Sequence, residues 1–338
     1  MRGGLVPTYL NKMLKEHLIY LICPKCEGDL SLISPFFQNG KIEKGELKCV
    51  ACNAIFPIVN FIPRFVSSEN YASNFGLEWI KHAQTQYDSH SGSNLSEKRF
   101  FEETKWPHDL SGEVILEAGS GSGRFTEQAA KTAAMIISFD YSVAVEANYQ
   151  SNGDKDNVLI VQADIYKMPF RKNYFDKIFC FGVLQHTPNP QKSFFNLVNY
   201  LKSNGKICVD IYRKLRLLFF TKYFVRIFTR KMNSEKLYKR CRKWVNLLWK
   251  PTAWIAKLPK GRFINKLLFV FADYRGWLPL RNEVLKEWAI LDTFDMLSPR
   301  YDKPQSLKTI KKWFQKANLK NIEVRPGYNG IEGRGEKK

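Results

Sequence analysis

The sequence predicts an α/β fold in which a mainly parallel β-sheet is covered by helices on both faces. Short apolar runs, separated by helical stretches, occur at 114–118, 135–139, 158–161, 177–181 and 205–211. Strands that alternate with helices form parallel sheets, because each connecting helix packs back onto the sheet. Two cysteine pairs before this core and a basic, aromatic segment after it predict two additions, a small metal-binding unit and a helical insertion.

The two cysteine pairs lie close together near the start of the chain. Cys23 and Cys26 form the first pair and Cys49 and Cys52 the second, and 22 residues lie between the pairs. Four thiolates at this spacing can close a tetrahedral zinc site. Because such a site has no open position, we expect a structural Zn2+ that stabilises a segment too small to have a core of its own.

A glycine-rich turn follows the first apolar run of the core. It contains Gly119, Gly121 and Gly123, where the absence of side chains lets the backbone approach a ligand. Such a turn suits a dinucleotide as well as S-adenosylmethionine (SAM). Glu117 precedes the turn, and a carboxylate there would repel a pyrophosphate but suit the cationic methionyl end of SAM.

Three further motifs fit a nucleoside ligand. Asp140 ends the second apolar run, where an acid can accept hydrogen bonds from both ribose hydroxyls. Asp164, followed by Ile165, comes after the third run and can accept from an adenine amino group. The fourth run leads through Phe181 into a loop that contains His186.

With these motifs in this order, residues 114–205 resemble the class I SAM-dependent methyltransferases of the bacterial small-molecule type. The resemblance implies a Rossmann-like seven-stranded sheet with the last strand antiparallel, and a loop from Phe181 to His186 that faces the methyl group. It also implies the following cofactor-binding residues: Glu117, Gly119, Gly121, Gly123, Asp140, Tyr141, Asp164, Ile165 and Phe181. The cysteine pairs are similar to the zinc ribbon that precedes many such enzymes, including some ribosomal RNA methyltransferases.

The chain is expected to divide into five parts. In order, these are a zinc ribbon (1–65), a helical connector or lid (66–110), the SAM-binding core (111–212), a basic aromatic helical insertion (213–290) and a C-terminal completion of the core (291–338). Within the connector we expect helices at 75–82 and 95–104. Within the last part we expect a helix at 306–317 and a strand at 321–325, followed by a partly loose glycine-rich tail.

The net charge of +21 is concentrated around the insertion, because residues 206–282 hold 20 lysines and arginines against three acids. Such a field attracts nucleic acid, an anionic membrane surface or a phosphorylated substrate. Residues 215–228 are also strongly apolar. That pattern suits helical packing over the active site, binding to an anionic membrane, or stacking on RNA bases. Because apolar residues dominate, we rank RNA below a small-molecule or lipid-linked acceptor.

The sequence therefore predicts a SAM-dependent methyltransferase that acts on a small-molecule, lipid-linked or glycan-linked acceptor. The loop at His186 lacks the Asn-Pro-Pro-Tyr type of motif found in enzymes that methylate amino groups, so we favour oxygen as the acceptor atom. A hydroxyl acceptor needs a base, for which the candidates are His186, Tyr212, Tyr301 and Asp210. The acids and Tyr301 of residues 291–304 are further candidates for the acceptor pocket.

Two alternatives to this function stay open. One is an RNA methyltransferase that holds RNA with its ribbon and insertion, and the other is a non-catalytic binding module with a SAM fold. A dinucleotide dehydrogenase is a further alternative, which absence of SAM binding would favour. Neither a signal peptide nor a transmembrane run is visible in the sequence. We therefore expect a cytoplasmic protein, or one attached peripherally to the inner face of the membrane.

Overall fold

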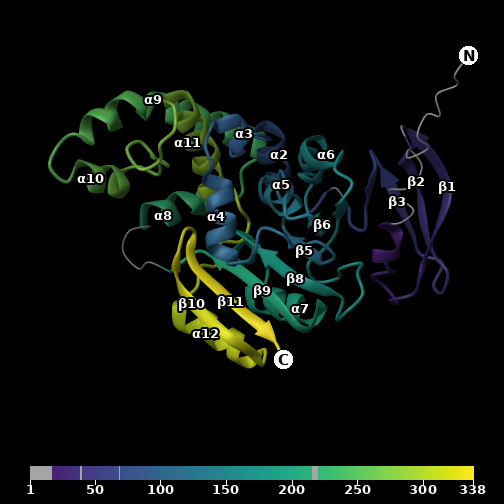
Figure 1. The fold of residues 1–338 in the computed structure, drawn as a ribbon. Helices are drawn as coiled ribbons and strands as arrows, with labels where there is room; N and C mark the ends of the chain where they lie inside the picture. The colour runs from purple at the N-terminus through teal and green to yellow at the C-terminus, as the bar shows by residue number, and fades with distance from the viewer. Residues whose placement is uncertain (1–16, 39, 68, 215–219) are drawn as a thin grey trace, which may run out of the picture.

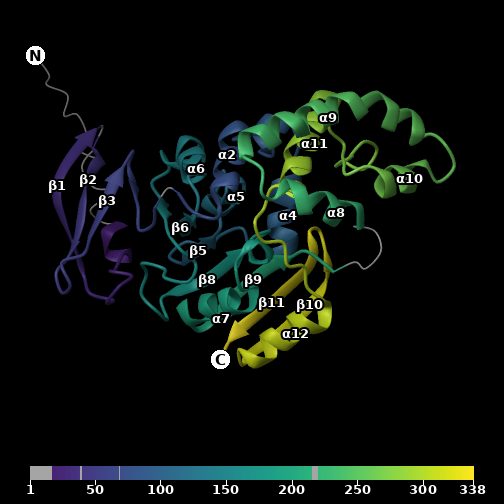
Figure 2. The same ribbon diagram turned by 180° about the vertical axis from the view of Figure 1, so that it is seen from behind.

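The computed structural model describes residues 17–338 apart from residues 39, 68 and 215–219 (Figure 1). A small sheet lies at one end of the molecule, a larger sheet in the middle, and a group of helices at the other end (Figures 1 and 2). The expectation about a signal peptide, and part of the expected apolar stretch 215–228, fall outside the described residues.

The small N-terminal unit is a four-stranded antiparallel sheet whose strands follow one another in sequence order. They are β1 (Leu30–Gln38), β2 (Lys41–Cys49), β3 (Ile55–Val59) and β4 (Ile62–Pro63), preceded by the short 3-10 helix η1 (Leu18–Tyr20). The unit shares one hydrophobic cluster with the large sheet, in which Leu47 and Phe56 join Leu116 and Phe170. It therefore packs as part of the core.

The large sheet has seven strands in the order β10-β11-β9-β8-β5-β6-β7. They are β5 (Val114–Ala118), β6 (Met135–Asp140), β7 (Val158–Gln162), β8 (Phe175–Cys180), β9 (Leu201–Ile211), β10 (Leu319–Gly327) and β11 (Gly330–Lys337). Neighbours from β9 to β7 are parallel, whereas β11 is antiparallel to both β9 and β10. This confirms the predicted α/β fold, including the seven strands and the antiparallel last strand.

Helices cover both faces of the large sheet (Figures 1 and 2). One face carries α7 (Pro190–Tyr200) and α12 (Leu307–Lys316), and the other carries α4 (Leu95–Thr104), α5 (Arg124–Ala130) and α6 (Val145–Asn152). Successive side chains of a strand point to opposite faces. Accordingly, Ile115 of β5 packs in the cluster under α4 and α5, and Leu116 packs in the cluster under α7 and α12.

The described part of the chain between β9 and α12 is mainly helical and extends from the end of the molecule opposite the small sheet (Figure 2). Its helices are α8 (Phe220–Thr229), α9 (Ser234–Ile255), α10 (Gly261–Leu268) and α11 (Asn282–Leu297). Helix α11 runs through the expected boundary at residue 290 and packs against α8, α9 and α2 (Ser73–Lys81). Among the described residues, no helix combines the length and the apolar character needed to cross a membrane.

The end of the chain corrects one expectation. The prediction of a partly loose tail after residue 325 is wrong, because Gly330–Lys337 form β11, which is inserted between β9 and β10. Gly333 and Gly335 face Phe314 of α12, and a Cβ atom at Gly333 would lie 2.7 Å from that ring. These glycines therefore allow α12 to approach the sheet closely. Their number in the sequence does not indicate a flexible tail.

Candidate functional site

A cleft of about 700 Å³ opens at the carboxyl ends of the parallel strands. Its floor contains residues that follow or end five strands, namely Gly119, Asp140, Ile165, Phe181 and Tyr212. Its roof comes from α2 and α11, which flank the core in sequence. Ligands of open α/β sheets bind at this edge.

The glycine turn forms the centre of the floor. Gly119, Gly121 and Gly123 have φ values of +80°, +54° and +89°, which side-chain-bearing residues rarely adopt. A Cβ atom at Gly119 would lie 2.3 Å from Val183, and one at Gly121 would lie 2.9 Å from Nε1 of Trp79. Gly119 and Gly121 line the cleft, whereas Gly123 begins α5 beneath it. The turn thus presents backbone to the cleft.

Asp140 holds the turn from the neighbouring strand. Its Oδ2 accepts a hydrogen bond from the N–H of Gly121 at 3.0 Å, and its Oδ1 accepts from the N–H and hydroxyl of Ser142 at 2.8 and 2.7 Å. Burial raises the pKa of Asp140, and these hydrogen bonds oppose the shift. Tyr141 lines the cleft beside it and packs on Tyr71, with 4.8 Å between the ring centres.

Two expected cofactor residues, Glu117 and Asp164, are not among the residues that line the cleft. Glu117 is only 2% exposed, and its Oε2 accepts from the hydroxyls of Ser138 at 2.8 Å and of Thr126. Burial raises the pKa of Glu117 to about 7. The carboxylate therefore joins β6 to α5 beneath the turn. Asp164 accepts from the N–H of Tyr166 at 2.9 Å and starts a turn after β7.

His186 lines the cleft with one ring nitrogen fixed and the other without a partner. Its Nδ1 lies 3.0 Å from the carbonyl oxygen of Tyr301. A carbonyl can only accept, so in the neutral ring Nδ1 carries the proton and Nε2 keeps its lone pair. Nε2 is buried and has no hydrogen-bond partner among the described residues. The ring packs against Phe75 and Tyr212, with ring centres 5.1 and 5.3 Å away.

The other candidate bases have different contacts. Tyr212 lines the cleft but donates its hydroxyl to Asp295 at 2.8 Å, and burial raises its pKa well above the usual range. Tyr301 offers its backbone carbonyl to His186 and packs its ring on Tyr71. Tyr301 is not among the residues that line the cleft, whereas Tyr71, on which its ring packs, is.

The carboxylate of Asp210 is held in an ion pair. Its carboxylate pairs with Arg99 of α4 and accepts a hydrogen bond from the N–H of Gly182. Arg99 also donates to Glu103 at 2.6 Å. Asp210 thus fixes the loop after β8 to α4.

Residues of α2, α4, α5 and α11 that the sequence motifs did not single out also line the cleft. They are two aromatic residues, one acid and two arginines that line the cleft: Trp79, Trp288, Glu78, Arg99 and Arg124. Asp292 and Asp295, from the segment expected to line an acceptor pocket, lie there too. Burial raises the pKa of Asp292 to about 7. Burial, followed by the proximity of Asp295 and Asp292, raises the pKa of Glu78.

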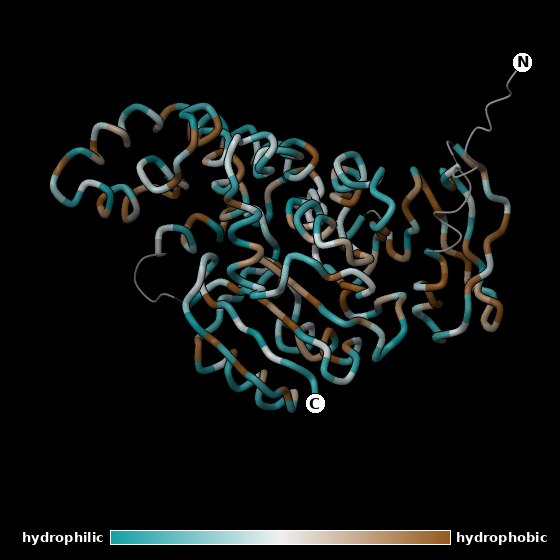
Figure 3. Tube along the Cα trace, viewed as in Figure 1, coloured by the Kyte–Doolittle hydropathy of each residue, from teal (hydrophilic) through white to brown (hydrophobic). Residues whose placement is uncertain are grey.

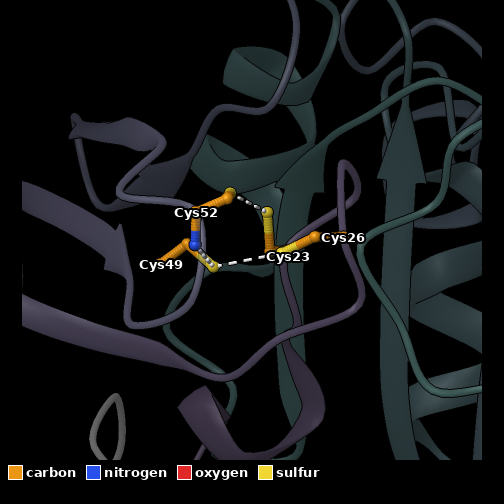
Figure 4. Close-up of side chains that lie close together, drawn as sticks. All are labelled: Cys23, Cys26, Cys49 and Cys52. Carbon is orange, nitrogen blue, oxygen red and sulfur yellow. Dashed lines mark hydrogen bonds between the residues drawn. The ribbon is translucent and has the colours of Figure 1, made fainter.

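The four cysteines converge, with Cys23 and Cys26 from the segment before β1 and Cys49 and Cys52 from the end of β2 and the turn after it (Figure 4). Their sulfur atoms all lie within 4.8 Å of one another, with 3.6 Å between Cys23 and Cys52 and 3.4 Å between Cys26 and Cys49. Four sulfurs bound tetrahedrally to one Zn2+ at about 2.3 Å would lie about 3.8 Å apart. The donor set and its spacing therefore fit a tetrahedral metal ion.

Residues 116–209 match the family model of a methyltransferase domain. The match begins in β5, ends in β9, and includes the glycine turn, Asp140 and His186. This part of the chain is a class I SAM-dependent methyltransferase domain. The four-cysteine cluster precedes that domain in the same chain.

Similarity to curated proteins extends over about a third of the chain. The tRNA U34 carboxymethyltransferase of Campylobacter curvus is 29% identical over 108 residues, which are 31% of this chain and 36% of that protein. The ubiquinone biosynthesis O-methyltransferase of Coxiella burnetii is 28% identical over 100 residues, 29% of this chain and 43% of that protein. The matches thus span less than half the length of either relative.

Among solved structures, phosphoethanolamine N-methyltransferase 2 of Haemonchus contortus in complex with SAM is similar to the chain. Its sequence is 16% identical, with a TM-score of 0.40. The similarity covers 76% of this chain and 43% of the Haemonchus protein.

Proposed function

We propose that the chain transfers a methyl group from SAM to a hydroxyl of a small-molecule or lipid-linked acceptor. One observation carries this proposal. The cleft that is floored by the glycine turn and Asp140 is also lined by His186, whose buried Nε2 has no hydrogen-bond partner among the described residues. A nucleoside-binding surface and a residue that can accept a proton thus line the same cleft, as transfer to a hydroxyl requires.

The floor residues would hold the cofactor. Oδ2 of Asp140 accepts one hydrogen bond, from Gly121, and keeps a further lone pair, so the side chain can still accept from a ribose hydroxyl. The ring of Tyr141 and the aliphatic side chain of Ile165 offer apolar surface for an adenine ring. Glu117 supports the turn from beneath through its contacts to α5 and β6. When bound, SAM supplies an electrophilic methyl group on its sulfonium.

His186 would remove the proton of the acceptor hydroxyl. As the oxygen attacks, its proton passes to Nε2, and the Nδ1–H of the resulting imidazolium stays hydrogen-bonded to the carbonyl of Tyr301. The carbonyl fixes the tautomer and stabilises the charged ring. Phe75 and Tyr212 hold the ring in place.

Methyl transfer to RNA is the second candidate. The name of the Coxiella relative describes an O-methyltransferase, whereas the name of the Campylobacter relative describes an enzyme that acts on tRNA. The 20 lysines and arginines of residues 206–282 favour an RNA acceptor electrostatically. The two candidates differ in the pool of molecules that receives the methyl group.

The deciding experiment follows labelled methyl groups from SAM into a cell extract that is then fractionated into RNA, lipid and small polar molecules. We expect label in the lipid or small-molecule fraction, and none with Asp140→Ala. Label in RNA alone would favour the second candidate. Calorimetric binding of SAM without label in any fraction would contradict methyl transfer and indicate a binding module.

Once an acceptor is found, His186→Gln tests the proposed base. We expect kcat to fall by roughly 10²- to 10⁴-fold, with an unchanged dissociation constant for SAM. The control is His108→Gln, which alters an exposed histidine outside the cleft and should keep full activity. Unchanged kcat in His186→Gln, or a parallel loss of SAM affinity, would contradict the assignment.

A further inference from the structure

The insertion exposes apolar side chains to an unusual degree. Among the residues that the structure describes, 13 of the 21 exposed large apolar side chains lie between residues 223 and 277. Exposed apolar surface gathered in one region marks a site of contact with a protein or a membrane. The arrangement of these side chains on the helices shows which contact fits.

Helix α8 has the reverse of the pattern expected for a helix in water. It buries Lys222 and Arg226, and Nζ of Lys222 lies 2.7 Å from Oδ2 of Asp302. Arg226 donates to two backbone carbonyls at the end of α11. In contrast, Phe224 and Phe228 are 55% and 65% exposed. The outer face of α8 is therefore suited to an apolar environment.

Helices α9 and α10 each carry an exposed apolar stripe as well. On and just after α9 the stripe recurs every three or four residues: Trp244, Leu247, Pro251, Trp254 and Leu258. On α10 it consists of Phe263, Ile264, Leu267 and Leu268. The hydroxyl of Thr221 in α8 donates to the carbonyl of Leu267 at 2.8 Å, and α9 packs against α10. The three stripes thus belong to one end of the molecule, where apolar and polar segments alternate (Figure 3).

Exposed cations accompany these stripes. Six of them lie on α9: Lys236, Lys239, Arg240, Arg242, Lys243 and Lys250. Two more, Lys257 and Lys260, lie between α9 and α10. Apolar side chains flanked by Lys and Arg suit the boundary between acyl chains and anionic headgroups. Aliphatic residues such as Leu247 and Ile264 have no role in stacking on bases, and a second copy of this surface would be repelled by its like charge.

We propose that α8, α9 and α10 bind an anionic membrane surface, with the apolar stripes in the acyl boundary and the cations against phosphate groups. Helix α8 also contributes Lys222 and Tyr223 to the cleft, so the cleft opens beside the membrane-binding face. This inference goes beyond methyl transfer. Its link to a lipid-linked acceptor rests on the proposed function, whereas the binding itself does not.

The test is flotation of the full chain, without SAM, on vesicles of phosphatidylglycerol and phosphatidylethanolamine, with pure phosphatidylcholine vesicles for comparison. We expect binding to the anionic vesicles that weakens as salt is added. Phe224→Ser combined with Phe228→Ser should bind at least about tenfold more weakly. The matched control is Phe36→Ser combined with Phe37→Ser, which alters two exposed phenylalanines of β1 at the opposite end of the molecule and should bind like the wild type (Figure 1).

Several results would overturn the proposal. These are no binding to the anionic vesicles, equal binding by the Phe224/Phe228 variant, or a dimer in light scattering that this variant converts to a monomer. Matching near-ultraviolet circular dichroism of variant and wild type excludes misfolding as the cause of lost binding. His186→Gln should bind vesicles normally, so failure of membrane binding and failure of methyl transfer can be told apart.

Discussion

Glu117 is a carboxylate enclosed beneath the glycine turn, and no cation pairs with it among the described residues. Burial raises its pKa from the ordinary 4.5 to about 7. At pH values between these two pKa values, Glu117 is protonated in the folded state and ionised in the unfolded state. The free energy of unfolding therefore falls as pH rises through this window, by up to about 3 kcal/mol from this one group.

Glu117→Gln removes this ionisation and keeps an acceptor for Thr126 and Ser138. Relative to the variant, we expect the wild type to lose up to about 3 kcal/mol as pH rises from about 5 to about 8. Urea unfolding at the two pH values measures the difference. The control is Glu69→Gln, which alters an exposed carboxylate. Its free energy of unfolding should differ from that of the wild type by the same amount at both pH values. If the free energies of unfolding of the wild type and Glu117→Gln differ by an amount that does not change with pH, the buried ionisation of Glu117 is contradicted.

At the scale of elements, the small sheet holds one wall of the cleft in place. The N–H of Ile22 donates to the carbonyl of Pro169, and the N–H of Phe65 donates to that of Gln162, both at 2.9 Å. These bonds fix the two ends of residues 162–170, the segment that contains Ile165. The cysteine cluster, which orders the loops between the strands, is therefore connected to the expected adenine side of the cleft.

Loss of the metal should consequently weaken SAM binding. Cys26→Ser combined with Cys52→Ser changes two exposed thiols, so little packing is lost. We expect bound zinc, measured by elemental mass spectrometry, to fall from about one ion per chain to almost none, and the dissociation constant for SAM to rise several-fold. A chelator should reproduce this in the wild type, reversibly with added zinc. Unchanged zinc content would refute the metal site, and lost zinc with unchanged SAM affinity would refute the coupling.

The sequence predicts those elements whose signals are local. The apolar run 114–118 and the helix expected at 95–104 coincide with β5 and α4, because turn residues bound both segments. The hairpin of β1 and β2 was missed, since the second half of β1 is exposed and lacks an apolar pattern. The roof of the cleft was missed for another reason. Glu78 and Trp288 are more than 200 residues apart and share no motif, so only the fold brings them together.

The whole molecule has a strongly uneven distribution of charge. Residues 206–282 hold 20 cations and three acids, so most of these cations have no acid of the same segment to pair with. Helices α8, α9 and α10 of this segment lie at the end opposite the small sheet (Figure 2). Repulsion among them destabilises the folded state, and salt screens it over about 10 Å at 0.1 M. The same field would attract an anionic membrane. Salt should therefore act on stability and on membrane binding in opposite directions.

We expect Tm to rise by about 2 °C between about 0.02 and about 0.3 M salt, while retention on anionic vesicles falls over the same range. Changing Lys243, Lys250 and Lys257 together to glutamine should flatten both responses, because all three are exposed within the insertion. The control changes Lys311, Lys312 and Lys316, the same number of exposed lysines on α12, to glutamine and should keep both responses. Equal flattening by both sets would mean that total charge, and not the field of the insertion, governs them.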